Sequence, residues 1–101
     1  MELALAPFPA GECSEADARR WLEEEQGARV MVVPDAPGHD YPPHSHDCDE
    51  IIVGVEGHID FWAEGQHFPL EAGMVLYLPV GTEHSARVGP GGCLYLVGQV
   101  R

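Results

Sequence analysis

The stretch HSHDCDEIIVGVEGHIDFW, residues 44–62, contains the features that decide the fold. Two runs rich in β-branched and aromatic residues, 50–55 and 58–62, are separated only by Glu56 and Gly57. Short runs of this composition, bounded by glycine, are typical of strands. The stretch also opens with two histidines two residues apart, and an extended chain places both side chains on one face. It therefore predicts a strand-rich fold that carries a histidine cluster.

Similar runs lie on both sides of this stretch. We expect seven strands, at residues 29–33, 50–55, 58–62, 66–70, 74–78, 84–88 and 94–100. Parallel strands need long crossover connections, which these short spacings exclude, so the sequence predicts an all-β antiparallel sandwich or barrel. A tight hairpin is expected at Glu64-Gly65, a proline-rich loop at 34–43 and a glycine-rich turn at 89–92.

One stretch, residues 14–26, has a helical pattern. Ser14 suits the position that caps a helix, Trp21 and Leu22 lie on its apolar stripe, and Gly27 suits the position just past its end. The chain is therefore divided into an N-terminal segment with a short helix, residues 1–26, and a β-barrel domain, residues 27–101.

Charge and composition exclude several classes of function. The 101 residues include 17 acidic and 5 basic side chains, for a formal net charge of -12, and no lysine is present. Schiff-base and P-loop lysine chemistry are therefore excluded. The lack of a basic cluster argues against nucleic-acid and membrane partners. Three scattered cysteines, no signal peptide and no apolar run of about 18 residues lead us to expect a cytoplasmic protein with free thiols.

The histidines form the candidate functional site. His44 and His46 share one face of an extended segment, Glu50 follows four residues later, and His84 opens a later strand. Three imidazoles and one carboxylate that converge inside a barrel would bind one divalent transition metal, with Fe, Mn, Ni, Cu, Co and Zn all compatible. Four protein ligands leave coordination positions open, as a catalytic ion requires.

The spacing of these residues resembles the two motifs of the cupin superfamily, in particular its small single-domain members. The first motif matches Gly38, His44, His46, Glu50 and Gly57, and the second matches Gly73, Pro79, Gly81 and His84. This resemblance implies a double-stranded β-helix, or jelly-roll barrel, and a metal held by His44, His46, Glu50 and His84. It implies no particular reaction, because cupins include enzymes, storage proteins and ligand sensors.

Other residues near the motifs have alternative interpretations. Val88 stands where the second motif usually has asparagine, which predicts a more apolar pocket wall. Seven further residues could either contribute to a ligand site or be ordinary core and surface residues. They are His39, Tyr41, Cys48, His58, Trp62, His67 and Arg87.

Three functions are compatible with the sequence. The first is a metal-dependent enzyme acting on a small oxygenated molecule, and the lack of lysine favours dioxygenase-type chemistry. The second is a non-catalytic module that binds a metal or a small ligand, with no fused DNA-binding domain expected. The third is a scaffold within a homodimer, in which residues 3–8 add a strand across the interface. We therefore expect the protein to form a homodimer and to bind a small molecule.

Overall fold

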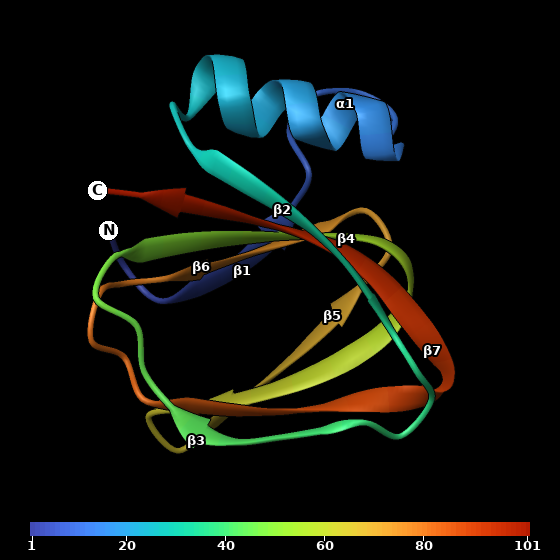
Figure 1. Cartoon of the computed structure of the whole chain (residues 1–101), viewed down its shortest axis with the longest axis vertical. Helices are drawn as coiled ribbons and strands as arrows, with labels where there is room; N and C mark the ends of the chain where they lie inside the picture. Colours follow the sequence, from blue (N-terminus) through green and yellow to red (C-terminus); the bar gives the residue numbers. More distant parts are fainter.

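All 101 residues are described by the computed structural model, in which one continuous antiparallel sheet folds over itself into two layers (Figure 1). The elements in chain order are β1 (Ala4–Pro7), α1 (Glu15–Arg20), the π-helical turn η1 (Trp21–Glu25), β2 (Arg29–Asp35), β3 (Asp40–His44), β4 (Asp49–Ala63), β5 (Gln66–Glu71), β6 (Met74–Leu78) and β7 (His84–Val100). The predicted all-β antiparallel barrel is confirmed. No helix combines the length and the apolar character needed to cross a membrane.

Strands β4 and β7 pair with each other in both layers. The first half of β4 pairs with the second half of β7 in a layer ordered β1-β6-β4-β7-β2. The second half of β4 pairs with the first half of β7, with β5 and β3 at the edges of this layer. The sequence runs 50–55 and 58–62 are therefore one bent strand, as are the runs 84–88 and 94–100.

The bend in β4 depends on Gly57. Its φ of +75° lies in the left-handed region, and a Cβ atom there would collide with the backbone carbonyl oxygen of Gly92. The pairing register between β4 and β7 shifts on both sides of this glycine, as expected for a bulge that turns a strand from one layer into the other. The expected hairpin at Glu64-Gly65 is confirmed between β4 and β5, with positive φ at both residues.

Two apolar clusters hold the layers together. A cluster inside the barrel includes Ile52, Phe61 and Leu76, and a second cluster, outside the upper layer, includes Leu22 and Val53. Neighbouring residues of β4 are thus buried on opposite faces, one against the barrel interior and one against the helix. This explains why the run 50–55 is almost continuously apolar instead of alternating.

The helix forms at the predicted residues, but it is not the first element of the chain. Ser14 accepts a hydrogen bond from the Asp17 backbone N–H at 3.1 Å, as the sequence predicts for its cap. The second turn is π-helical and ends where Gln26 N–H donates to the Trp21 carbonyl. Strand β1 precedes the helix and pairs with β6 of the same chain, so the expected N-terminal helix follows a strand of the barrel.

Two segments expected to be irregular are strands. The region 34–43 contains the end of β2 and most of β3, because an edge strand tolerates the missing N–H donors of Pro42 and Pro43. Residues 89–92 continue β7 through its bend, where small residues allow close approach: a Cβ on Gly89 would lie 3.1 Å from the His58 carbonyl oxygen. Glycine therefore marks a bend within a strand here, not a turn between strands.

Candidate metal centre and cavity

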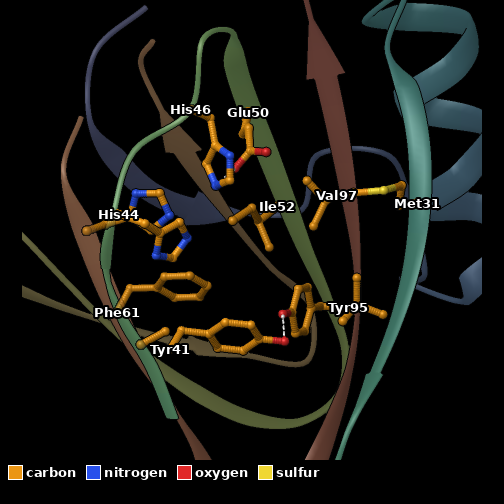
Figure 2. Close-up of a pocket in the computed structure, with 12 residues that line it drawn as sticks. Met31, Tyr41, His44, His46, Glu50, Ile52, Phe61, Tyr95 and Val97 are labelled. Carbon is orange, nitrogen blue, oxygen red and sulfur yellow. Dashed lines mark hydrogen bonds and ion pairs between the residues drawn. The ribbon is translucent and has the colours of Figure 1, made fainter. Parts of the chain in front are cut away.

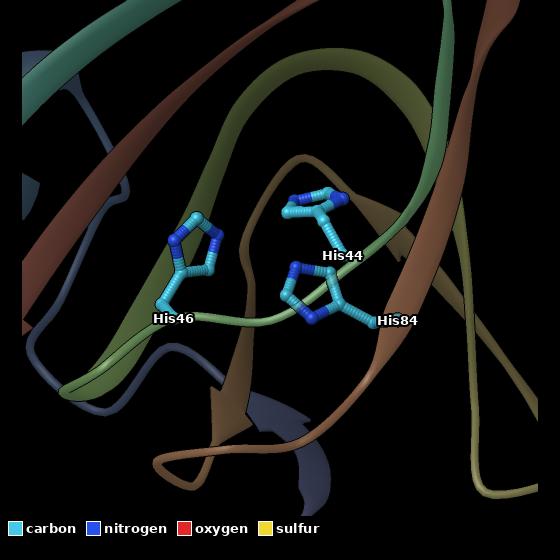
Figure 3. Close-up of side chains that lie close together, drawn as sticks. All are labelled: His44, His46 and His84. Atoms are coloured by element: carbon cyan, nitrogen blue, oxygen red, sulfur yellow. The ribbon is translucent and has the colours of Figure 1, made fainter.

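Three histidines converge at one end of the barrel (Figure 3). His44 ends β3, His46 lies in the following loop, and His84 begins β7 opposite His44. One potential ligand atom from each lies within 4.8 Å of the other two. The structure thus brings together all three histidines that the sequence analysis selected.

The tautomers of two histidines are set by backbone contacts. The Nδ1 atoms of His44 and His84 lie 2.7 and 2.9 Å from the carbonyl oxygens of Pro42 and Thr82. A carbonyl oxygen can only accept, so each Nδ1 carries the proton and donates, which leaves a lone pair on Nε2. Metal-binding histidines are oriented by this kind of outer hydrogen bond.

Glu50, the fourth residue of the predicted ligand set, lies next to His46 but outside the group of three mutually close histidines. Its side chain is 6 % exposed, and its Oε1 lies 3.5 Å from His46 Nε2. Its Oε2 accepts a hydrogen bond from the Gln99 amide at 3.3 Å. One carboxylate oxygen is therefore held by the barrel wall, while the other faces the histidines (Figure 2).

The neutral state of His84 suits a metal ligand. Burial is the largest effect on the pKa of His84 and lowers it; the Thr82 carbonyl and Glu50 act in the opposite direction, while His44 and His46 lower the pKa further. A neutral imidazole presents the lone pair that coordination requires. Three imidazoles beside one carboxylate are a donor set that fits a divalent transition ion.

Loop contacts position the second histidine. Gly81 N–H donates to the His46 carbonyl at 3.0 Å, and Val80 N–H donates to Asp49 Oδ1 at 2.8 Å. The loop that leads into His84 is thereby joined to the loop between His46 and Glu50. These bonds connect ligand candidates that are about 40 residues apart in the sequence.

A cavity of about 220 Å³ extends from the histidines into the barrel (Figure 2). Its apolar wall is formed by Met31, Val33, Ile52, Phe61, Ala86 and Val97. Tyr41 and Tyr95 line the cavity as well and lie at the end away from His46 and Glu50. The cavity is smaller than the usual range for sites that bind drug-sized molecules, so it suits a small ligand.

A hydrogen-bonded network closes the tyrosine end. Tyr41 Oη and Tyr95 Oη lie 2.7 and 3.0 Å from Asp35 Oδ2, and 3.3 Å from each other. Burial raises the pKa of both tyrosines, and the hydrogen bonds to Asp35 add to this effect. Both hydroxyls are therefore protonated at neutral pH. The sequence analysis did not select Asp35 for this role or Tyr95 at all, because no motif or local spacing connects them.

The structure places the remaining candidates outside the cavity. Val88 is buried in the barrel core and does not line the cavity, so the apolar wall comes from other residues. Trp62 is on the outer face and stacks on His67, and Arg87 is paired there with Asp40 at 2.7 Å.

Three further candidates do not line the cavity either. His39 is exposed and touches the Tyr41 ring edge-on, with a centroid distance of 4.6 Å. His58 bonds Asp60 on the outer face, beyond the bulge at Gly57. Cys48 is buried beside the ligand loop but does not line the cavity, and burial raises the pKa of its thiol.

Comparisons with known proteins agree with this geometry. The dimethylsulfoniopropionate lyase DddW of Ruegeria pomeroyi is 36 % identical over 77 residues, which cover 73 % of this chain and 51 % of the lyase. The crystal structure of the DMSP lyase DddQ from the same species has a TM-score of 0.67 at 29 % identity, covering 71 % of this chain and 37 % of DddQ. The chain thus spans about half the length of DddW and less of DddQ.

A smaller relative matches over most of its length. The cupin-2 domain protein of Shewanella frigidimarina has a TM-score of 0.62 at 26 % identity, covering 71 % of this chain and 69 % of that chain. Residues 31–96, which contain the three histidines, Glu50 and every cavity-lining residue except Val97, match the family model Cupin_2, described as a cupin domain. The chain therefore belongs to the Cupin_2 family of cupin domains.

Proposed function

We propose that this protein is a metal-dependent cupin enzyme that acts on a small oxygenated molecule. The observation that supports this most directly is the position of three imidazoles and Glu50 at one end of an otherwise apolar cavity. His44, His46, Glu50 and His84 would hold the ion.

The bound ion would supply Lewis acidity and, if it were iron or copper, a place for redox chemistry. The donor set suits Fe, Mn, Ni, Cu, Co and Zn. The residues of the chain have separate tasks. The apolar wall excludes water from the ligand body, and His44 and His84 keep their Nε2 lone pairs directed by donating from Nδ1.

Proton transfer in the cavity would depend on Glu50. Apart from the histidines and Glu50, the titratable groups that line the cavity are Tyr41 and Tyr95, which are neutral and donate to Asp35. Neither hydroxyl is suited to accept a proton from carbon at neutral pH. Glu50 Oε1 is the carboxylate oxygen that faces the cluster, so we assign it as the proton acceptor in an elimination reaction.

Two reaction classes follow from this proposal. Similarity to DddW supports a lyase that eliminates a leaving group from a small carboxylate, whereas the lack of lysine favours the dioxygenase-type reaction that the sequence predicts. Elimination needs no oxidant, but dioxygenase chemistry consumes O₂. The two classes can therefore be separated by working with and without oxygen.

The experiment starts from protein loaded separately with each candidate metal. Turnover of dimethylsulfoniopropionate to dimethyl sulfide and acrylate without oxygen would support the lyase class. Oxygen uptake with small hydroxy or keto acids would support the dioxygenase class. If none of these metals binds, the proposed function is wrong. Loss of turnover in Glu50→Gln that has been confirmed to carry one ion per chain, with Glu56→Gln as the matched control, tests the assigned proton acceptor.

A non-catalytic binding module is the second candidate. It is favoured by one observation: no proton acceptor lines the cavity other than the proposed metal ligands. Stoichiometric metal and tight binding of a small ligand, with no turnover under either condition, would support the module over the enzyme.

A further inference from the structure

The free edge of β2 differs from the other free edges of the two layers (Figure 1). Strand β1 has only four residues and ends at Pro7, β3 contains Pro42 and Pro43, and β5 has Pro69 inside it. Short length and proline both protect a sheet edge from pairing with a further strand. Strand β2 has seven residues, and its first five, 29–33, all keep their N–H groups. It is therefore the least protected edge of the barrel.

The exposed edge is also apolar. Val30–Val33 is an unbroken apolar run, none of its residues is buried, and Met31 is 48 % exposed. Val30 and Val32 pack partly against the helix cluster, whereas Met31 and Val33 line the cavity on the other face (Figure 2). A long apolar edge strand is a place where a second strand adds.

The two ends of β2 carry opposite charges that have no charged partner within the chain. Arg29 begins the strand and forms no ion pair, whereas each of the other four arginines is paired with an aspartate or a glutamate. Asp35 ends the strand, and its Oδ2 accepts hydrogen bonds from two tyrosine hydroxyls. Its Oδ1 has no hydrogen-bond partner, and no arginine or histidine forms an ion pair with this carboxylate.

These two charges match each other only between two chains. Arg29 and Asp35 lie on the same face of β2 but six residues, or about 20 Å, apart along the strand. If two copies of β2 align antiparallel with Val32 at the centre, Arg29 of each copy lies opposite Asp35 of the other. Opposite charges directly across an antiparallel pair stabilise it, and this alignment forms two such pairs.

The same alignment matches the apolar residues between the charged ends. Met31 lies opposite Val33 of the second copy, so the most exposed apolar side chain of the strand becomes covered. Val30 lies opposite Pro34 of the second copy. Pro34 has no N–H, which costs the pairing at most one hydrogen bond per copy. The sequence of β2 is therefore complementary to itself in charge and in apolar surface.

We propose that β2 is a dimerisation strand, through which two copies of this chain pair antiparallel about Val32, with Arg29 of each copy against Asp35 of the other. The upper layers of both copies form one continuous sheet in this dimer. Each copy covers Met31 of the other and so closes the cavity on its β2 side. The expected interface strand, β1, is not needed, because it pairs with β6 of its own chain. This inference does not depend on a bound metal.

Sedimentation equilibrium measures whether the dimer forms. One pair of strands is a small interface, so a dissociation constant on the order of 10 µM is expected. The net charge of -12 on each chain opposes association, and the measurement is therefore made at about 0.15 M salt, where this repulsion is screened. A monomer at chain concentrations up to about 1 mM would overturn the proposal and leave the edge free for a strand of a different protein.

Charge reversal tests the paired ends of the strand. Arg29→Glu places two carboxylates opposite each other at both ends of the paired strands, and dimerisation should weaken by about tenfold or more. Arg19→Glu makes the same change of charge on the helix and is the matched control, with an expected change below about twofold. Equal weakening in the two variants would show an effect of net charge alone and contradict the proposal.

Cysteine crosslinking tests the register. Val32 lies opposite itself in the proposed dimer, whereas the two copies of Val30 lie more than about 10 Å apart, beyond the reach of a disulfide. Mild oxidation should therefore crosslink Val32→Cys and leave Val30→Cys at the level of the wild type, which has three cysteines of its own. Circular dichroism confirms that both variants are folded. A dimer that crosslinks equally well through Val30→Cys would contradict the proposed pairing.

Discussion

His44 and His84 are direct partners across the pairing of β3 with β7, and each donates from Nδ1 to the carbonyl two residues before it. The same kind of hydrogen bond thus sets the tautomer of His44 on β3 and of His84 on β7. Their ring centroids lie 4.3 Å apart, so the two Nε2 lone pairs belong to one small cluster. Both imidazoles are therefore placed to bind the same ion.

Replacing His44 or His84 with alanine is expected to abolish stoichiometric metal binding, because each removes one of the imidazole ligands. Metal content per chain, measured by mass spectrometry after loading and desalting, is the readout. His67→Ala is the control, since His67 lies on the outer face against Trp62. Retention of about one ion per chain in the double variant His44→Ala/His84→Ala would contradict the site assignment.

Glu50→Gln is expected to weaken metal binding by at least about tenfold. The substitution keeps the shape of the side chain but removes the negative charge beside His46. Competition with a coloured chelator measures the change in affinity. Exposed Glu56 gives the matched control Glu56→Gln, and similar affinities for the two variants would show that Glu50 is not a ligand.

Gly57→Ala is expected to destabilise the fold by about 3 kcal/mol or more, because its new Cβ would meet the Gly92 carbonyl at the bend of β4. Gly65→Ala is the comparison: its φ is also positive, at +73°, but no atom lies within 4 Å of an added Cβ. Its cost is expected to be about 1 kcal/mol, from backbone strain alone. Urea unfolding measures the loss of unfolding free energy in each variant. Equal losses for Gly57→Ala and Gly65→Ala would argue against a steric clash at the bend of β4.

A pH-dependent contribution to stability is expected from Asp60. Partial burial raises the pKa of Asp60, but hydrogen bonds from His67 and His58, at 2.6 and 2.9 Å, outweigh it and hold the pKa below its ordinary value. A lowered folded-state pKa stabilises the protein above the unfolded value of about 3.9 and loses this contribution as pH falls through the folded value.

The difference in unfolding free energy between the wild type and Asp60→Asn should therefore shrink as pH falls below about 4. Urea unfolding at a series of pH values measures this difference. Glu56→Gln, which removes a carboxylate without an ion-pair partner, should show no comparable trend. A difference that stays constant down to about pH 2 would contradict the assigned role of Asp60.

The sequence predicts the histidine cluster well because its residues follow local rules. The alternation of a strand places His44 and His46 together, and fixed motif spacings connect them to Glu50 and His84. The composition of β-branched runs likewise predicts most strands. Strand alternation and β-branched runs are short-range patterns visible in one sequence, whereas the connection of His84 to the other histidines comes from the resemblance to the cupin motifs.

The parts that were not predicted depend on contacts between distant residues. Asp35 and Tyr95 are 60 residues apart, and nothing near either residue indicates that they bond. Strand β3 contains two prolines, which predict a loop, yet its position at a sheet edge makes them acceptable. Glycines at 89–92 suggest a turn, although here they allow a long strand to bend.

The pairing of β4 with β7 has a consequence for the order of folding. Asp49 pairs with Val100 at one end and Ala63 with His84 at the other, so most contacts of the central pair join residues far apart in sequence. Such topologies fold slowly, on the order of milliseconds to seconds, because long loops must close first. His84 reaches His44 and His46 only when β7 has paired, so the complete ligand set would not exist in a growing chain. The histidine cluster is therefore a product of long-range pairing, formed only when the first half of β7 lies beside β3.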